Sequence, residues 1–424
     1  MRKAQEQHLI AGLDIGSTVT RLVVGQVVER GGAEGTELQI LGAAAAETQG
    51  VHKGAITSIE DVVSSISSCL EQAERMAGIP VDSAWIGVSG SHIMTQTSKG
   101  VVAVANPDSE ISEEDVARAI EASKSVAAPM NYEVLHVLPK VFSIDGQPGV
   151  KDPIGMSGIR LEVDTQIILG SAAQVKNLTK AIYRTGLEIE DLVYSVLANA
   201  EAVITNRQRD LGVAVVNIGA STTSIGVFEE GDLLHTTVLP IGSEHITNDI
   251  AIGLRTSIDI AENVKLNFVD CSLANLNKNE EFDLYEAGAP DHELVKKHYL
   301  QEIVRARVEE ILKKIDREFA VAKRSGMLPA GVVFTGSGAK LPGFIEEAKK
   351  ILRLPATLGY PLHVLSVTDK VNDIGFATAV GLVKWGSVMG SQTSGSRRSG
   401  GGFNLKSLGG IGGQMKKWFK ALIP

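Results

Sequence analysis

The stretch 215-VVNIGASTTSIGVF-228 repeats, with small changes, the stretch 13-LDIGSTVTRLVV-24 near the start of the chain. Each copy consists of an apolar strand, a turn with glycine and small hydroxyl residues, and a second apolar strand. Glycine lets a backbone approach an anion closely, and turn N–H groups and hydroxyls can donate to phosphate oxygens. One copy alone describes any ordinary hairpin. Two copies, one opening each half, predict a duplicated domain with a ligand held between the halves.

A third stretch, 332-VVFTGSGAKLPGF-344, fits the same scheme. It is a buried strand followed by a glycine-rich turn and the start of a helix. The turn lacks the spacing of a Rossmann fingerprint, and the chain contains no GK[ST] P-loop. A nucleotide site built from these three stretches is therefore of neither common kind.

Length and composition indicate a folded protein of about two domains, because 424 residues exceed what one core holds. Strand and helix patterns alternate along most of the chain, which predicts α/β architecture. The two cysteines, Cys69 and Cys271, argue against a disulfide framework or a cysteine-rich zinc site. No uncharged apolar window is long enough for a transmembrane helix, and the first residues lack the apolar core of a secretory signal.

Charge is distributed unevenly. Residues 387–424 hold six basic residues and no acidic one. Because the net charge of the whole chain is −9, the rest of the chain has a net charge of −15. The acidic body argues against nucleic acid as the main partner. Residues 387–402 are rich in glycine and serine and predict a flexible linker.

The last residues, 403–424, predict a basic amphipathic helix that binds an anionic membrane surface. The alternative is a helix that folds back onto the protein or onto a partner. Because so short a helix is marginal in water, it is expected to fold on the lipid, and a polymer that carries many such tails would bind by avidity. The apolar face consists of Met415, Trp418, Phe419, Leu422 and Ile423, and Lys416, Lys417 and Lys420 lie off it.

Long stretches of the chain resemble the bacterial cell-division family FtsA, within the actin-like superfamily. They are 242-GSEHITNDIAIGLRTSIDIAENVK-265, 50-GVHKGAITSIED-61, 87-GVSGSHI-93, 138-LPKVFSIDGQPGVKDPIGMSGIRLEV-163 and 372-NDIGFATAVGLVKWG-386. The resemblance implies an actin-like α/β fold of two domains with duplicated phosphate hairpins, an inserted subdomain and a C-terminal amphipathic helix. The boundaries that it implies are 1–85, 164–200 and 358–386 for domain 1, 86–163 for the insertion, and 201–357 for domain 2, with a peptide-binding subdomain at about 246–311.

The resemblance also implies an ATP site with Mg²⁺. Glu262 and Lys265 match its nucleoside-contacting pair, although an exposed i,i+3 ion pair would give the same pattern. Its other residues are Asp14, Gly16, Ser17 and Thr18 in the first phosphate hairpin, Asn217, Gly219, Ser221 and Thr222 in the second, and Gly336, Ser337 and Gly338 in the adenosine turn.

Asn217 stands where actin-like ATPases usually place a second aspartate. An amide offers a carbonyl oxygen but no negative charge and cannot act as a base, whereas magnesium prefers oxygen ligands and keeps several waters. Asp14 alone would then contact the metal, through water. We expect nucleotide binding with weakened magnesium binding and slow or absent hydrolysis, so that the protein is at most a weak ATPase. Harmless drift at this position is the alternative.

The resemblance implies a scaffold that polymerises and tethers the division protein FtsZ to the cytoplasmic face of the cell membrane at the division site, together with other division proteins. The FtsZ C-terminal peptide would bind near Arg307 and Glu310, which could equally form an ordinary helix ion pair. Two alternatives remain open: a PilM-like pilus-assembly adaptor and a small-molecule kinase of the same superfamily.

Overall fold

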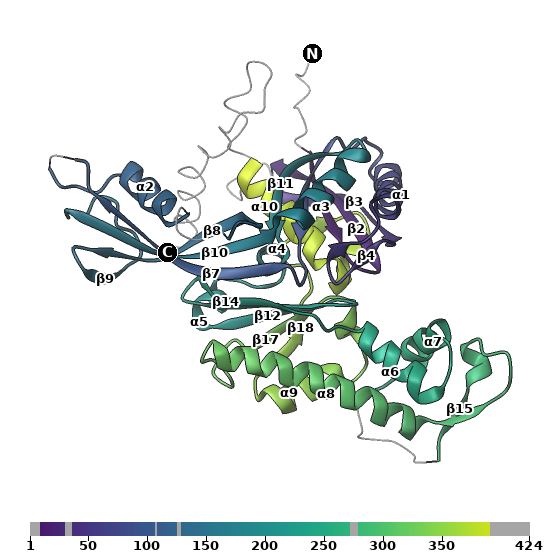
Figure 1. The fold of residues 1–424 in the computed structure, drawn as a ribbon. Helices are drawn as coiled ribbons and strands as arrows, with labels where there is room; N and C mark the ends of the chain where they lie inside the picture. The colour runs from purple at the N-terminus through teal and green to yellow at the C-terminus, as the bar shows by residue number, and fades with distance from the viewer. Residues whose placement is uncertain (1–8, 30–35, 107, 125–128, 272–278, 391–424) are drawn as a thin grey trace.

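The computed structural model describes residues 9–29, 36–106, 108–124, 129–271 and 279–390. Figure 1 shows domain 1 at the upper right, domain 2 below it, and a separate sheet that projects to the left. Within the described ranges, no helix combines the length and the apolarity that crossing a membrane requires.

Domain 1 is a six-stranded sheet with the order β11-β6-β1-β2-β3-β19. Helices α1 and α3 cover one face, and α10 packs on the other through apolar side chains such as Val380 and Val383. The elements are β1 (Leu9–Ile15), β2 (Val19–Glu29), β3 (Thr36–Glu47), β4 (Val51–His52), β5 (Ala55–Ile56), α1 (Ile59–Ala77), β6 (Ser83–Val88), α3 (Ala172–Arg184), β11 (Glu188–Tyr194), β19 (Leu365–Ser366), η3 (Asp369–Asn372), η4 (Ile374–Phe376) and α10 (Ala377–Gly390).

Domain 2 repeats this connectivity in a sheet with the order β14-β13-β12-β17-β18. In both domains three strands form an antiparallel meander, and two further strands extend the sheet in parallel from the first strand of the meander. The parallel strands β1, β6 and β11 of domain 1 correspond to β12, β17 and β18 of domain 2. The predicted duplication is confirmed. The elements are α4 (Ser195–Val203), α5 (Asn206–Leu211), β12 (Val213–Ile218), β13 (Thr223–Glu229), β14 (Asp232–Leu239), α8 (Lys297–Val321), β17 (Val332–Thr335), η2 (Ser337–Lys340), α9 (Phe344–Leu352) and β18 (Ala356–Leu358).

A helical extension of domain 2 lies at the lower right of Figure 1. The side chains of the extension share one continuous core with the domain 2 sheet. Helix α8 contributes to this core along its length and so joins the extension to the sheet. The extension contains α6 (Glu244–Leu254), α7 (Ile258–Phe268), β15 (Glu281–Asp283), η1 (Leu284–Ala287) and β16 (Leu294–Lys296).

The projecting sheet is the inserted subdomain, with strand order β7-β10-β8-β9 and one covering helix, α2. The expected boundaries, 86–163, differ from this sheet at both ends. Strand β6 pairs with β1 and β11 and so belongs to domain 1, and β10 continues past residue 163 because β7 and β8 pair with it up to Gly170. The elements are β7 (Ile93–Ala103), α2 (Glu113–Lys124), β8 (Tyr132–Ile144), β9 (Gln147–Val150) and β10 (Arg160–Ser171).

The linker expected at 387–402 begins later than the sequence indicates. Helix α10 runs to Gly390, and the Ser387 hydroxyl donates to the Lys384 carbonyl oxygen at 2.7 Å, as in a regular helix. The rest of the linker and the amphipathic segment 403–424 lie outside the described residues.

Candidate functional site

The two glycine hairpins have the same geometry. The Gly16 N–H donates to the Val19 carbonyl oxygen at 3.1 Å, and the Gly219 N–H donates to the Thr222 carbonyl oxygen at 2.9 Å. Ser17 Oγ of the first hairpin and Ser221 Oγ of the second lie 2.6 Å apart. The residues predicted for the two halves of one site therefore face each other across the domains.

The third glycine turn packs on the second hairpin. Gly336 has a φ of 82°, and a Cβ on it would lie 2.2 Å from Asn217 Oδ1. A Cβ on Gly338 would lie 2.6 Å from the Ile218 side chain. Neither position has room for a side chain, so the sequence TGSG sets how closely this turn approaches β12.

Arg21, which the sequence analysis did not single out, links the two domains at this turn. Its Nη2 donates to Ser337 Oγ at 2.9 Å, and its guanidinium lies over the Phe376 ring, 5.6 Å from the centroid. In the β1–β2 ladder Arg21 is the direct partner of Asp14. A basic residue seven positions after the aspartate was a usable signal, because the hairpin register brings the two residues together.

Asp14 is partly exposed at the end of β1 and is surrounded by protein groups. Loss of hydration raises the pKa of its carboxyl group from 3.8 to about 6, although the Arg21 charge and a hydrogen bond from the Thr378 side chain oppose the shift. A carboxylate that the protein leaves incompletely compensated is a favourable place for a hydrated cation.

A buried chain of polar side chains connects Asp14 to domain 2. Asn199 Nδ2 donates to Thr378 Oγ1 at 3.1 Å, and Thr335 Oγ1 donates to Asn199 Oδ1 at 3.4 Å. All three of these residues are buried, and they come from α4, α10 and β17. No motif marked these three residues in the sequence, although an asparagine inside the apolar helix SVLANAEAV was a detectable signal.

Glu262 and Lys265 form an ion pair on α7 with 2.6 Å between Oε2 and Nζ. The Thr247 hydroxyl on α6 accepts from the lysine at 2.8 Å and donates to the same carboxylate at 2.6 Å. Only 7% of the Lys265 side chain is exposed, so the interpretation as an exposed ion pair does not describe this lysine.

Helix α6 joins this cluster to the second hairpin. The Ser243 and Glu244 N–H groups donate to the Gly219 and Ala220 carbonyl oxygens at 3.0 and 2.8 Å. A Cβ on Gly242 would lie 2.4 Å from the Ala220 oxygen, so glycine permits this contact. Helix α6 thus contacts both the Glu262–Lys265 pair, predicted to bind the nucleoside, and the second hairpin, predicted to bind phosphate.

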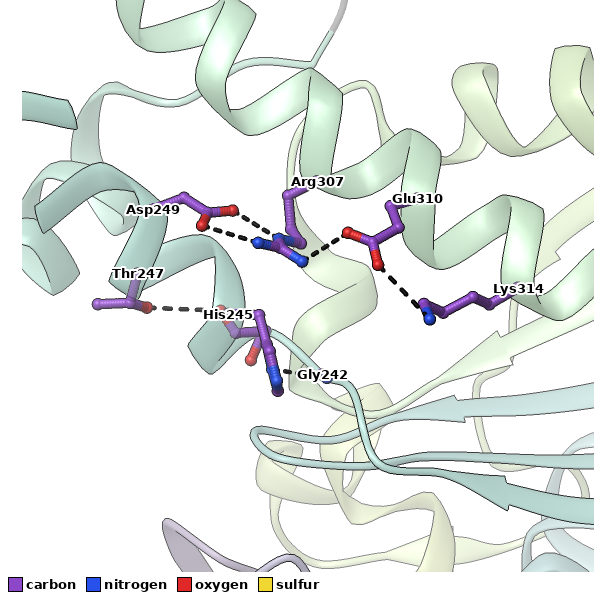
Figure 2. Close-up of polar contacts among 8 residues, drawn as sticks. Gly242, His245, Thr247, Asp249, Arg307, Glu310 and Lys314 are labelled. Atoms are coloured by element: carbon purple, nitrogen blue, oxygen red, sulfur yellow. Dashed lines mark hydrogen bonds and ion pairs between the residues drawn. The ribbon is translucent and has the colours of Figure 1, made fainter. Parts of the chain in front are cut away.

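Arg307 and Glu310 lie on the long helix α8, on the side that faces α6 (Figure 2). Arg307 Nη1 lies 2.5 Å from Glu310 Oε2. Its Nε and Nη2 donate to the two carboxylate oxygens of Asp249 on α6, at 2.5 and 2.8 Å. The contact with Asp249 raises the pKa of Arg307. Arg307 therefore does more than form a local helix contact, because its bidentate contact with Asp249 joins α8 to α6.

A groove of about 380 Å³ lies beside Arg307, between α8 and the segment that leads from β14 into α6. Leu239, Pro240 and Ile241 supply apolar wall, and Lys314 and Arg317 supply positive charge. His245 also lines it, and its Nδ1 accepts from the Gly242 N–H at 3.2 Å (Figure 2). The groove thus combines an apolar wall with a charged rim, a combination found at protein–protein interfaces.

The hairpin residues fit a hydrated magnesium ion held mainly by phosphates, which needs only one or two protein carboxylates. Asp14 supplies one carboxylate, and Asn217, at the equivalent position of β12, supplies an amide oxygen. The described residues contain no group of three or more His, Cys, Asp or Glu side chains that could hold a metal without such phosphates.

Family comparisons agree with this architecture. Residues 90–169 match the family described as "SHS2 domain inserted in FTSA", and residues 214–381 match "Cell division protein FtsA". Cell division protein FtsA of Pseudomonas aeruginosa is 35% identical over 91% of this chain and 91% of its own length. The Bacillus subtilis protein of that name is 36% identical over 89% of this chain and 83% of its own length.

Solved structures confirm the predicted actin-like fold. The PilM-PilN type IV pilus biogenesis complex contains a chain with a TM-score of 0.65 and 16% identity, matched over 89% of this chain and 98% of that chain. MreB5 of Spiroplasma citri bound to ADP gives a TM-score of 0.54 at 12% identity, over 92% and 100%. Fold, inserted subdomain and sequence identity agree, and the chain belongs to the family of the cell division protein FtsA.

Proposed function

We propose that this protein is an ATP-binding scaffold of cell division. The observation that carries the proposal is the meeting of two duplicated hairpins, with Ser17 Oγ 2.6 Å from Ser221 Oγ, in a chain of the FtsA family. Phosphates would bind between the hairpin turns, whose glycines and hydroxyls come from both domains. The base and sugar would lie between the Gly336–Gly338 turn and the Glu262–Lys265 pair.

Magnesium would bind through the phosphates and water, with Asp14 as the charged contact. When bound, the ion neutralises phosphate charge. The amide of Asn217 cannot accept a proton from an attacking water, so we propose that hydrolysis is slow or absent. ATP would then act as a ligand that favours one arrangement of the domains.

The partner site that we propose for the FtsZ C-terminal peptide is the α6–α8 surface at Arg307 and Glu310, together with the adjoining groove. A charged peptide end can replace part of this network, in which Arg307 pairs with Asp249 and Glu310, and Glu310 also pairs with Lys314. An apolar peptide side chain has the Leu239–Ile241 wall to pack on.

Membrane attachment is assigned to the basic amphipathic segment 403–424, and filament formation provides the many copies that a weak anchor needs. The protein would then act on the inner face of the cytoplasmic membrane, at the division site. Two alternative functions are a pilus-assembly adaptor and a small-molecule kinase. The FtsA relatives at 35 and 36% identity argue against the adaptor, because the chain resembles the PilM-PilN complex in fold alone. No observation favours the small-molecule kinase.

The experiment is co-sedimentation with anionic liposomes, with and without ATP and an FtsZ tail peptide. We expect the protein to pellet with liposomes, to retain the peptide in the pellet, and to pellet more completely with ATP. A protein that binds neither ATP nor liposomes would refute the proposal, and phosphoryl transfer to a sugar would replace it with the kinase.

A further inference from the structure

We propose that Lys53 is a further nucleotide-binding residue, which recognises the terminal phosphate of a nucleoside triphosphate and separates triphosphate from diphosphate. The inference rests on the nucleotide function proposed for the cleft. It adds to the two hairpins, the Gly336 turn and the Glu262–Lys265 pair a further segment, the short hairpin of β4 and β5 with the sequence VHKGAI.

The tip of this hairpin contacts the point where the two domains meet. The Lys53 N–H donates to Ser221 Oγ at 3.1 Å, and the same oxygen lies 2.6 Å from Ser17 Oγ. The backbone of Lys53 is therefore beside both phosphate hairpins at once, although β4 and β5 belong to neither.

The hairpin tip is also held from its other side. The Lys53 carbonyl oxygen accepts from the Ser91 N–H at 3.1 Å and from the Ser91 hydroxyl at 3.4 Å. A Cβ on Gly54 would lie 2.3 Å from the Gly90 Cα, so the two backbones touch. These contacts fix the backbone from which the Lys53 side chain extends, and a fixed starting point reduces the entropy lost when a ligand binds.

The backbone conformation at the tip is unusual for a lysine. Lys53 has a φ of 52° and Gly54 a φ of 77°, so both central residues of this two-residue turn are left-handed. Asn, Asp and Gly are favoured in such turns, and a longer L-residue is disfavoured. Residues held in disfavoured conformations gather at ligand sites, where the surrounding structure enforces them.

The charge of Lys53 is available for a ligand. Among the described residues no carboxylate pairs with its ammonium group, and the residue is half-buried. The flexible four-carbon stem lets the ammonium extend to a phosphate bound beside the two hairpin turns, and a compact cation suits a phosphate.

The direction of the site explains why the terminal phosphate is the one recognised. The Gly336 turn packs against Asn217 and Ile218, which precede the turn of the second hairpin. The Lys53 N–H donates to Ser221, which lies within that turn. A nucleotide with its base at the Gly336 turn extends its phosphates along the hairpin toward Ser221. The last phosphate is then the one nearest Lys53.

The test uses substitutions that suit a left-handed turn. Lys53→Asn keeps the turn and removes the charge, Lys53→Arg keeps the charge, and His52→Ser changes an exposed neighbour as the control. Each full-length variant is titrated with ATP and with ADP in magnesium by calorimetry. We expect Lys53→Asn to weaken ATP binding about tenfold or more, and ADP binding by less than about threefold, as the loss of one charged contact predicts. Lys53→Arg and His52→Ser should retain the preference of the unmodified protein for ATP.

Equal losses for ATP and ADP, or no loss for either, would overturn the inference, because Lys53 would then act through its backbone alone. If the unmodified protein binds neither nucleotide, the proposed ATP site fails and the inference fails with it. Thermal unfolding of each variant confirms that it is folded before titration.

Discussion

Replacing Asp14 with asparagine should stabilise the protein in the absence of nucleotide. The folded-state pKa of Asp14 is about 6, above its unfolded value of 3.8, because burial disfavours the charged form. The folded protein therefore binds this proton more tightly than the unfolded chain does. The resulting stabilisation is fully present below about pH 4 and is lost as pH rises through about 6.

The magnitude follows from the shift. Each pKa unit corresponds to about 1.4 kcal/mol, so a shift from 3.8 to about 6 gives an upper bound of about 3 kcal/mol. Asp14 keeps some solvent contact, which reduces the effect, and we expect about 1–3 kcal/mol in favour of Asp14→Asn at pH 7.5. Near pH 4 the two proteins should have similar free energies of unfolding, because the carboxyl group is protonated in the folded protein.

The assay is denaturant unfolding of nucleotide-free protein at pH 4, 5.5, 6.5 and 7.5, followed by circular dichroism and by fluorescence. Coincidence of the two signals tests whether the two domains unfold together. Asp82→Asn, at an exposed position of domain 1, controls for the loss of one negative charge. With ATP and magnesium the order should reverse, because the ligand stabilises only the protein that binds it.

Two results would contradict this prediction: a lower free energy of unfolding for Asp14→Asn at pH 7.5, or an advantage of Asp14→Asn that does not shrink toward pH 4. In the first case the carboxylate would be well compensated by Arg21 and Thr378. Asp14 would then have no energetic reason to attract a hydrated cation.

Three further predictions concern the rest of the site. Asn217→Asp should raise magnesium affinity in nucleotide titrations more than it changes ATP affinity, and unmodified protein that releases phosphate at roughly 1 per second or faster would contradict a structural nucleotide role. Arg307→Glu should weaken the binding of an acidic FtsZ tail peptide by about tenfold or more in calorimetry, while the affinity for ATP changes little. Arg305→Glu is the matched control, and unchanged peptide affinity for Arg307→Glu would remove Arg307 from the site. Deletion of residues 414–424 should abolish co-sedimentation with anionic liposomes while the body still binds ATP, and continued pelleting would place the anchor elsewhere.

The sequence predicted the hairpins well because their geometry is local. A glycine and a few hydroxyl residues within one turn determine how closely the backbone can approach a ligand, and both copies carry that pattern. The contacts of Arg21 with Ser337 and of Asn199 with Thr378 join residues far apart in the chain, and no local pattern specifies them. The same holds for Asp249, whose bidentate contact with Arg307 depends on how α6 and α8 pack.

The inserted subdomain shows why boundaries are harder to predict than elements. The length of β10 follows from its neighbours β7 and β8, which offer pairing partners beyond residue 163. Local strand propensity does not contain this information. Helix α10 likewise packs through Val380 and Val383 on an apolar face to which β1 and β2 contribute, a contact between segments far apart in the chain.

The two ends of that subdomain are neighbours, since Ile93 near the start of β7 is paired with Gly170 near the end of β10. The chain therefore leaves domain 1 and returns to it at almost the same place. A module attached in this way can be gained, lost or exchanged during evolution without rerouting the surrounding chain, so new partners can be recruited while the phosphate hairpins stay unchanged. Leu138 and Ile168 pack into the core beside Tyr194, and any replacement module would have to supply apolar side chains at the same two places.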